Sequence, residues 1–287
     1  MKRHTEYLGV WLVVGAFAVG LAQDSVPVPA PDAEVMLAAV SRDRSMLVGG
    51  IGPSRWMAQG SVWVEPLALI NSSGDWKSLP CAAGSGKGCV KFARQYLSKP
   101  HTYTVISDPR AAVIQGAPAT LSECYDFGGK GIYSGAPLQT SGIAASAADL
   151  FANSAGLREL NRAETGAVRK SLVALTEMGL DSTQEVRLFA LSIEGQDMVI
   201  VQRAYPDSER RKLIFAIGRI DQGRFHTLYW KKNTEDEQER VLGTVGLKSG
   251  RAFLVTAVSD PESQSFRVYG IRNGRLVLIF SGGGSSC

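Results

Sequence analysis

The sequence predicts an exported α+β protein, with a mixed N-terminal half that contains short helices and a C-terminal antiparallel β-meander built from two repeat-like units. Three observations carry this prediction: a secretory-type N-terminus, one clear helical periodicity near the middle, and strand-like alternation from Val186 onward. We divide the chain into residues 1–22 (signal peptide), 23–32 (Pro-rich linker), 33–145 (disulfide-containing α+β region), 146–180 (helical segment) and 181–287 (antiparallel β region with two repeat units).

The N-terminus has the order of a secretory signal peptide. Lys2 and Arg3 precede an apolar run from Leu8 to Gly20, and Gly20-Leu21-Ala22 then has the small residues of a cleavage site. The run is shorter than the about 20 residues that a membrane span needs, although an uncleaved anchor is the alternative. We therefore expect a periplasmic or secreted protein with no membrane span after signal removal.

Export also changes how the four cysteines are interpreted. Cys81, Cys89, Cys124 and Cys287 are an even set, which in an oxidising compartment indicates disulfides. Cys81 and Cys89 would close a short loop, and Cys124 would then pair with Cys287. Sequence alone allows three pairings. Zinc, with His101 as a further ligand, is the rival interpretation, but the spacing lacks C-x-x-C pairs.

The stretch PCAAGSGKGCVKFARQYL (residues 80–97) resembles a phosphate-binding loop only superficially. Such a loop needs a hydroxyl residue after its lysine, to hold Mg²⁺, and a glycine at its first position. Here Gly88 follows Lys87, and Cys81 stands at the first position. We therefore interpret GSGKG as a turn that leads into a helix over Val90–Leu97, with Phe92 and Tyr96 on its inner face and Cys89 as a further candidate.

The rest of the N-terminal half reads as extended pieces and loops. Ser61–Asn71 is a strand pair or a bulged strand, because Pro66 interrupts it. Residues 71–75 have turn chemistry, and Trp76 begins another extended piece. Residues 102–107 and 111–115 predict a hairpin, and the Gly- and Ser-rich residues 128–147 predict a flexible loop.

Two helices are expected next. The first is short, from Ser146 to about Asn153. The second runs from Asn161 to Met178, with Glu164 as the reciprocal partner of the Asn161 cap. Its predicted apolar face consists of Ala163, Ala167, Val168, Leu172 and Leu175.

Eight strands are predicted after residue 185. They are Val186–Ile193, Met198–Ala204, Lys212–Ile220, Arg224–Trp230, Val241–Leu247, Phe253–Val258, Phe266–Arg272 and Arg275–Phe280. Asn273-Gly274 is a strong two-residue hairpin signal. Asp221-Gln222-Gly223 stands at the matching place and predicts a three-residue loop.

These strands contain an internal repeat. MVIVQRAYPDSE (residues 198–209) aligns with FLVTAVSDPESQ (residues 253–264), and Gly223-Arg224-Phe225 aligns with Gly274-Arg275-Leu276. The two units predict either a continuous meander or two adjacent propeller-like blades. Because two blades cannot close a ring, we expect an open sheet or an arrangement completed by N-terminal strands.

The last unit, GLKSGRAFLVTAVSDPESQSFRVYGIRNGRLVLIFSGGG, resembles the FG-GAP or VCBS-type repeats of exported β-propellers. In those repeats a loop of the form D-x-D-G-D-G binds calcium. Gly246 to Arg251 stands at that place and supplies no carboxylate, whereas Ca²⁺ needs several oxygen ligands. The resemblance therefore implies a blade-like unit whose metal function has been lost.

Few residues are candidates for chemistry. The sequence has no G-x-S-x-G, S-x-x-K or H-E-x-x-H motif. His226 alternates with Leu228 and Trp230, which favours a packed or rim histidine. Glu123, Asp126 and Asp75 are possible partners in a carboxylate pair, and Trp56, Trp63 and Trp76 are core residues or an exposed strip for sugar or peptide contact.

We therefore predict an exported, non-enzymatic binding or envelope-associated interaction protein. The alternative is an extracytoplasmic hydrolase that uses Asp75, Asp126 or His101. We assign no catalytic residue, no cofactor and no metal. The expected partner is a protein, a peptide or a glycan, and not a nucleic acid, because the net charge of +4 is spread over segments of mixed sign.

Overall fold

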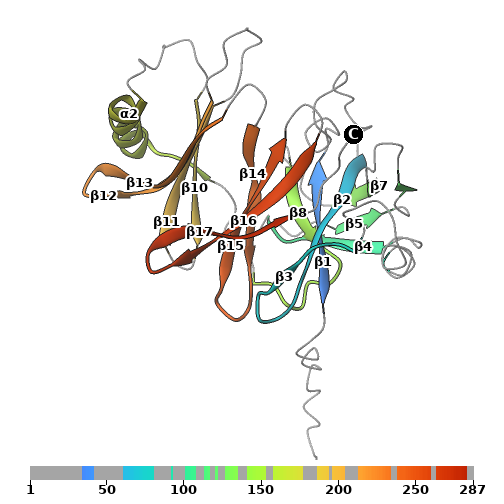
Figure 1. Cartoon of the computed structure of the whole chain (residues 1–287). Coiled ribbons are helices and arrows are strands. Elements are labelled where there is room, and N and C mark those ends of the chain that lie inside the picture. The colour runs from blue at the N-terminus through green and yellow to red at the C-terminus, as the bar shows by residue number, and fades with distance from the viewer. Residues whose placement is uncertain are drawn as a thin grey trace, which may run out of the picture.

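The computed structural model describes fourteen stretches of the chain (Figure 1). They are residues 34–41, 61–80, 92, 101–107, 113–116, 120–121, 127–134, 141–152, 158–176, 186–193, 196–203, 213–233, 238–259 and 263–282. These residues form three antiparallel sheets and one helix with defined ends, α2 (Arg162–Thr176). Among them, no helix is long and apolar enough to cross a membrane.

The predicted α+β class is wrong, because the described part of the N-terminal half is almost entirely strand. Residues 128–147, predicted as a flexible loop, contribute β7 (Phe127–Ser134) and β8 (Ser141–Ala145). The predicted helix from Ser146 is replaced, as far as Ala152, by bends, a turn and an isolated bridge. Small residues have weak strand propensity, but pairing of β8 with two neighbouring strands overrides it.

Six strands of the first sheet close into a barrel. They are β1 (Val35–Ser41), β2 (Ser61–Ile70), β7, β5 (Val113–Gly116), β4 (His101–Val105) and β8, in that order around the ring. Each pairs with the next in antiparallel sense, and β8 returns to β1. Two short strands, β3 (Trp76–Lys77) and β6 (Thr120–Leu121), extend the sheet beside β2 and β7.

Alternation along β1 divides the apolar residues between the two sides of this barrel. Met36, Ala38 and Val40 belong to one cluster, which also contains residues of β2, β4 and β8 and the helical residue Phe92. Leu37 and Ala39 belong to a second cluster on the opposite side. The burial predicted for Phe92 is confirmed; the rest of its predicted helix lies outside the described residues.

The strand β2 is bulged, as one of the two interpretations of Pro66 predicted. Ala38 pairs with Pro66 and Leu37 pairs with Ala68, so that Leu67 is the extra residue. Because the bulge interrupts the alternation, Leu67 and Ala68 both join the outer cluster.

The C-terminal half forms two further sheets, and its strands follow the predicted segments closely. The second sheet has the order β13-β12-β11-β10-β9, and the third has the order β14-β15-β16-β17. Their bounds are β9 (Arg158–Glu159), β10 (Val186–Ile193), β11 (Gln196–Arg203), β12 (Leu213–Asp221), β13 (Arg224–Asn233), β14 (Gln238–Gly246), β15 (Ala252–Ser259), β16 (Gln264–Arg272) and β17 (Arg275–Gly282).

The hairpins β12–β13 and β16–β17 share their backbone detail. Gln222 and Gly223 have φ of 49° and 73°, and Asn273 and Gly274 have φ of 51° and 70°, as a two-residue hairpin turn requires. The three-residue loop predicted for the first hairpin is wrong, because Asp221 pairs directly with Arg224. Each hairpin also changes register once, and in both cases the extra residue lies on the strand that follows the turn.

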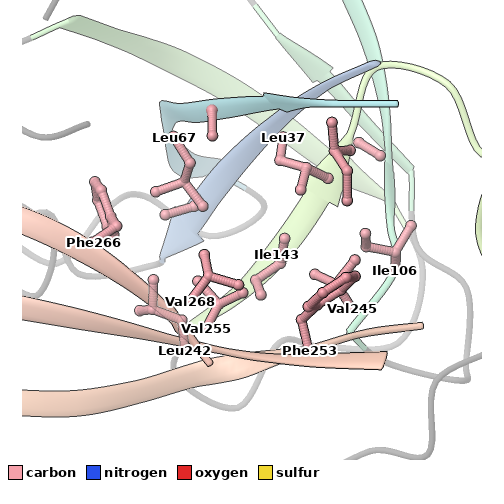
Figure 2. Packing of buried hydrophobic residues seen from close by; sticks show 14 of the residues in the cluster. Leu37, Leu67, Ile106, Ile143, Leu242, Val245, Phe253, Val255, Phe266 and Val268 are labelled. Carbon is pink, nitrogen blue, oxygen red and sulfur yellow. The ribbon is translucent and has the colours of Figure 1, made fainter. Parts of the chain in front are cut away.

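The sheets pack as layers, with the third sheet in the middle (Figure 1). One face of this sheet meets the barrel. Phe253, Val255 and Phe266 there belong to one cluster with Leu37 and Leu67 of the barrel, which face them in Figure 2. Its other face meets the second sheet. The buried residues of the cluster between them are Ile193, Met198, Ile200, Ile217, Val241, Leu254, Tyr269 and Leu276.

The helix α2 covers the outer face of the second sheet (Figure 1). Its predicted N-terminal cap is confirmed: the Asn161 amide donates to Glu164 Oε2 at 2.8 Å, and the Glu164 amide donates to Asn161 Oδ1 at 3.0 Å. Val168 is buried against this sheet, whereas Ala163, predicted on the same face, is exposed.

Candidate functional site

Of the residues named for the predicted hydrolase, the structure places the backbone of Asp75 and His101 on separate parts of the first sheet, and Asp126 lies outside the described residues. Asp75 lies in the turn before β3, where its backbone amide donates to Asn71 Oδ1 at 2.9 Å and its carboxylate accepts from Asn71 Nδ2 at 3.1 Å. His101 begins β4, which is separated from β3 in the sheet by β2, β1 and β8. Asp75 is exposed and closes a turn, which is the role that the local sequence Asn71–Asp75 predicted.

Several other predicted residues lie outside the described residues. They are Asp126, Glu123, Trp56 and the cysteines Cys81, Cys89, Cys124 and Cys287. The disulfide pairing therefore stays a prediction. Of the remaining tryptophans, Trp63 is buried in the outer barrel cluster, and Trp76 packs on the rings of Phe253 and Phe280, with centroids 5.4 Å and 6.0 Å away.

His226 is an exposed residue of β13, in agreement with the rim interpretation. The prediction that it shares a face with Leu228 and Trp230 fails at the bulge. Leu228 and Tyr229 both pack against the cluster between the second and third sheets, whereas Trp230 is exposed.

The most concentrated polar chemistry in the described residues surrounds Glu239 on β14. The residue is 2% exposed, and its carboxylate is held by three donors. Oε1 accepts from the hydroxyls of Tyr269 at 2.6 Å and Thr256 at 2.8 Å, and Oε2 accepts from Arg267 Nη1 at 3.0 Å. These residues come from three adjacent strands and share one face, because Thr256 lies opposite both Val241 and Arg267.

The face that carries Glu239 points toward the second sheet. The Tyr269 hydroxyl lies 3.4 Å from that of Tyr229 on β13, and the two rings are 5.2 Å apart. Burial raises the pKa of Tyr269 far above its ordinary value, and the Glu239 charge adds to the rise. Tyr269 therefore remains a proton donor to Glu239 across the physiological range, and its contact with Tyr229 links Glu239 to the second sheet.

The hydrogen bonds of the Glu239 carboxylate indicate a structural role rather than a role in acid–base catalysis. Both oxygens of the Glu239 carboxylate already accept hydrogen bonds, so that neither is presented to a substrate proton. A buried carboxylate with three donors instead fixes the register of β14, β15 and β16. Sequence reasoning missed this residue because it started the strand at Val241; the alternation of Glu239 with Val241 was the available signal.

A second candidate is the outer edge that β13 and β17 form. Each is the last strand of its sheet in the described residues, and the two strands contact each other. Trp230 on β13 is 51% exposed and Leu278 on β17 is 53% exposed. Trp230 lies opposite Ala216, on the α2 side of the second sheet, and Leu278 lies opposite Tyr269, on the face of the third sheet that meets the second. Exposed apolar side chains on edge strands are candidate contacts for a partner.

The loop Gly246–Arg251 is held by backbone hydrogen bonds. The Leu247 amide donates to the Arg251 carbonyl at 2.8 Å, and the Lys248 amide donates to the Leu150 carbonyl at 3.0 Å. In the described part of the chain, no three histidine, cysteine or acidic residues are grouped so that they could hold a metal ion.

Comparison with known proteins returned no matching family, no similar curated protein and no similar solved structure.

Proposed function

We propose that this chain is an exported, non-enzymatic binding protein of the cell envelope, whose layered sheets present one interaction surface. The observation that carries the proposal is the exposure of Trp230 and Leu278 on two edge strands that lie against each other. A few residues, often tryptophans, carry most of the binding free energy in protein interfaces, so Trp230 is the main expected contact and Leu278 an additional one.

The architecture behind this surface supports a scaffold role. The third sheet is packed on both faces, and Glu239 links three of its strands and, through Tyr269, the sheet beside it. A scaffold of this kind holds an edge strand in a fixed position, which lowers the ordering cost of binding.

The two C-terminal sheets support the proposal that this half consists of two blade-like repeats. β10–β13 and β14–β17 are both four-stranded antiparallel meanders, they pack face to face, and their last hairpins share turn and bulge. Propeller blades have this strand order and packing. The residues that form the metal loop in FG-GAP or VCBS-type repeats are replaced here by Gly246–Arg251, so we propose binding without calcium.

The proposal is tested by site-specific photo-crosslinking in an envelope preparation. A photoreactive residue is placed at Trp230 or at Leu278, and the control carries it at Lys248, which is also exposed but lies in the loop between β14 and β15. We expect a common crosslinked partner at 230 and 278 and none at 248. Equal labelling at all three positions, or none at 230 and 278, would contradict the proposed surface.

A further inference from the structure

We infer that the β16–β17 hairpin carries a binding site for a phosphate group, formed by the guanidinium groups of Arg272 and Arg275. The two residues pair directly across the hairpin, and both are exposed. This site is separate from the proposed interaction surface, because Arg275 and Leu278 lie on opposite faces of β17.

Alternation along the hairpin sets the side on which the two arginines lie. Leu276 is buried against the second sheet, and its partner Ile271 on β16 packs against the same cluster. Arg272 and Arg275 are the next residues toward the turn, so their side chains lie on the opposite face. Directly opposed side chains on one face have Cβ atoms about 4.5–5.5 Å apart, so that one ligand can contact both guanidinium groups.

The opposed arginines have no counter-charge in the described residues. Neither side chain takes part in an ion pair or a hydrogen bond with a described residue. Like charges at directly opposed positions destabilise a pair of strands. The turn residues Asn273 and Gly274, with φ of 51° and 70°, nevertheless hold the two strands at this point. An anion that accepts hydrogen bonds from both arginines would remove this repulsion.

The matching hairpin of the second sheet shows that the turn itself does not need two arginines. Its turn residues Gln222 and Gly223 have φ of 49° and 73°, close to the values of the β16–β17 turn. The pair that flanks this turn is Asp221 opposite Arg224, which combines opposite charges. Two hairpins with the same turn geometry thus differ in the charge of the flanking pair.

Further cations lie at the same end of the third sheet. Lys248 is exposed in the loop between β14 and β15. Arg251 immediately precedes β15, where its guanidinium group donates to the Ser73 carbonyl and lies over the Phe253 ring. Because β15 and β16 are antiparallel, the start of β15 and the end of β16 at Arg272 lie at one end of the sheet. These charges make this end attractive to anions.

Acidic residues in other turns are the alternative counter-charge for the two arginines. The described ones are Asp75, Asp149 and Asp197, and none forms an ion pair with the two arginines. Three more lie outside the described residues: Glu194 between β10 and β11, and Asp260 and Glu262 between β15 and β16. Glu194 follows Ile193, which shares a buried cluster with Leu276, so a Glu194→Gln variant belongs to the test.

The number of donors favours a phosphate group over a carboxylate. A carboxylate has two oxygens and is satisfied by one guanidinium group, whereas a terminal phosphate has three oxygens and can accept from two. The charge of a phosphate monoester, about −1.5 to −2 at pH 7, also matches two arginines. Inorganic phosphate and the phosphate monoester of a lipid headgroup share this chemistry.

The test uses the purified chain in phosphate-free buffer. Calorimetric titration with inorganic phosphate measures the dissociation constant, and acetate is the carboxylate control. We expect acetate to bind at least tenfold more weakly than phosphate, because it can use only one of the two arginines. Flotation with phosphatidylcholine vesicles, with and without phosphatidic acid, distinguishes the two sources: binding only to the vesicles with phosphatidic acid assigns the site to a lipid phosphate.

Matched variants separate this hairpin from general charge. Arg272→Gln with Arg275→Gln should weaken phosphate binding at least tenfold, because it removes two charge-assisted hydrogen-bonding groups. The control, Arg219→Gln with Arg224→Gln, removes two exposed arginines from the β12–β13 hairpin and should leave binding within about threefold. Circular dichroism verifies that both double variants fold.

A single variant tests the repulsion without any ligand. Arg272→Asp reproduces the Asp–Arg pair of the β12–β13 hairpin. It should abolish phosphate binding and yet raise the urea midpoint of the phosphate-free chain, because an attractive pair replaces a repulsive one. A general loss of structure would instead lower both.

Four outcomes would overturn the inference. They are acetate binding as tight as phosphate, equal loss in the two double variants, a lower urea midpoint for Arg272→Asp, and phosphate binding that Glu194→Gln tightens at least tenfold, because this acid would then be the partner of the arginines. Absence of binding to both inorganic phosphate and phosphatidic acid also removes the site. The photo-crosslinks at 230 and 278 do not depend on it, so the proposed function would still stand.

Discussion

Replacement of Glu239 by glutamine tests whether the buried carboxylate cluster holds the middle sheet together. Glutamine preserves the shape and one acceptor oxygen, which can still serve Tyr269 and Thr256 at 2.6 and 2.8 Å in the native structure. Its amide nitrogen, however, faces Arg267 Nη1, which lies 3.0 Å from the native oxygen. The variant therefore exchanges an ion pair for two opposed donors.

The magnitude follows from the exposure of the two partners. Removing one partner of a fully buried ion pair costs about 3–5 kcal/mol, because the other charge is left without compensation. The Arg267 side chain is 24% exposed and can turn toward water, whereas the Glu239 side chain is 0% exposed. We therefore expect Glu239→Gln to lower the free energy of unfolding by about 2–3 kcal/mol. This value lies between the cost of losing one hydrogen bond to a charged group and the cost of breaking a fully buried ion pair.

Urea unfolding, followed by tryptophan fluorescence and circular dichroism, measures this change. The control is Glu159→Gln, which removes an exposed carboxylate on β9 and should leave stability within about 0.5 kcal/mol. A double-mutant cycle with Arg267→Met should give a coupling energy of about 1–2 kcal/mol. A change below about 0.5 kcal/mol for Glu239→Gln, or no coupling energy with Arg267→Met, would refute the conclusion that the Glu239 carboxylate holds the middle sheet together.

Three further predictions address the helix, the hairpins and the cysteines. The hydrogen bond from Arg158 on β9 lowers the pKa of Glu164 to about 2. The ion pair therefore adds about 0.5–1 kcal/mol to the free energy of unfolding above pH 4.5, and this contribution is lost as the pH falls toward 2. In acid unfolding, the stabilities of Glu164→Gln and of the native chain should become equal near pH 2. Gly218→Ala places a Cβ against the backbone oxygen of His226 and should cost about 2–3 kcal/mol by overpacking. Gly274→Ala, with φ of 70° and open space around it, should cost only about 1 kcal/mol of backbone strain; equal melting temperatures of the two variants would contradict this ranking. Non-reducing peptide mapping should find Cys81 joined to Cys89, and a peptide that links either residue elsewhere would refute that pairing.

The sequence predicted local features where short-range chemistry decides the structure. The Asn161–Glu164 cap, the Asn273-Gly274 turn and the bulge at Pro66 each depend on residues within a few positions, and each is found in the structure. The eight C-terminal strands were predicted for the same reason, since their alternation and their turns lie close together in the chain.

The fold class was not predictable in this way, because pairing between distant segments decides it. The residues of β8 are mostly small and read as a loop, yet β1 and β4 pair with this strand on either side. Closure of the barrel depends on β2 meeting β7, more than sixty residues away along the chain. Neither contact leaves a local signal.

The same distinction, between local sequence features and contacts between distant segments, applies to the candidate sites. An N-terminal signal pattern, four cysteines and the lack of common catalytic motifs are properties of the residues themselves, and the sequence alone determined the expectations drawn from them. The burial of Glu239 and the edge position of β13 were decided by tertiary structure. The physical reason is that solvent exposure and strand neighbours arise only when segments far apart in the chain pack against one another.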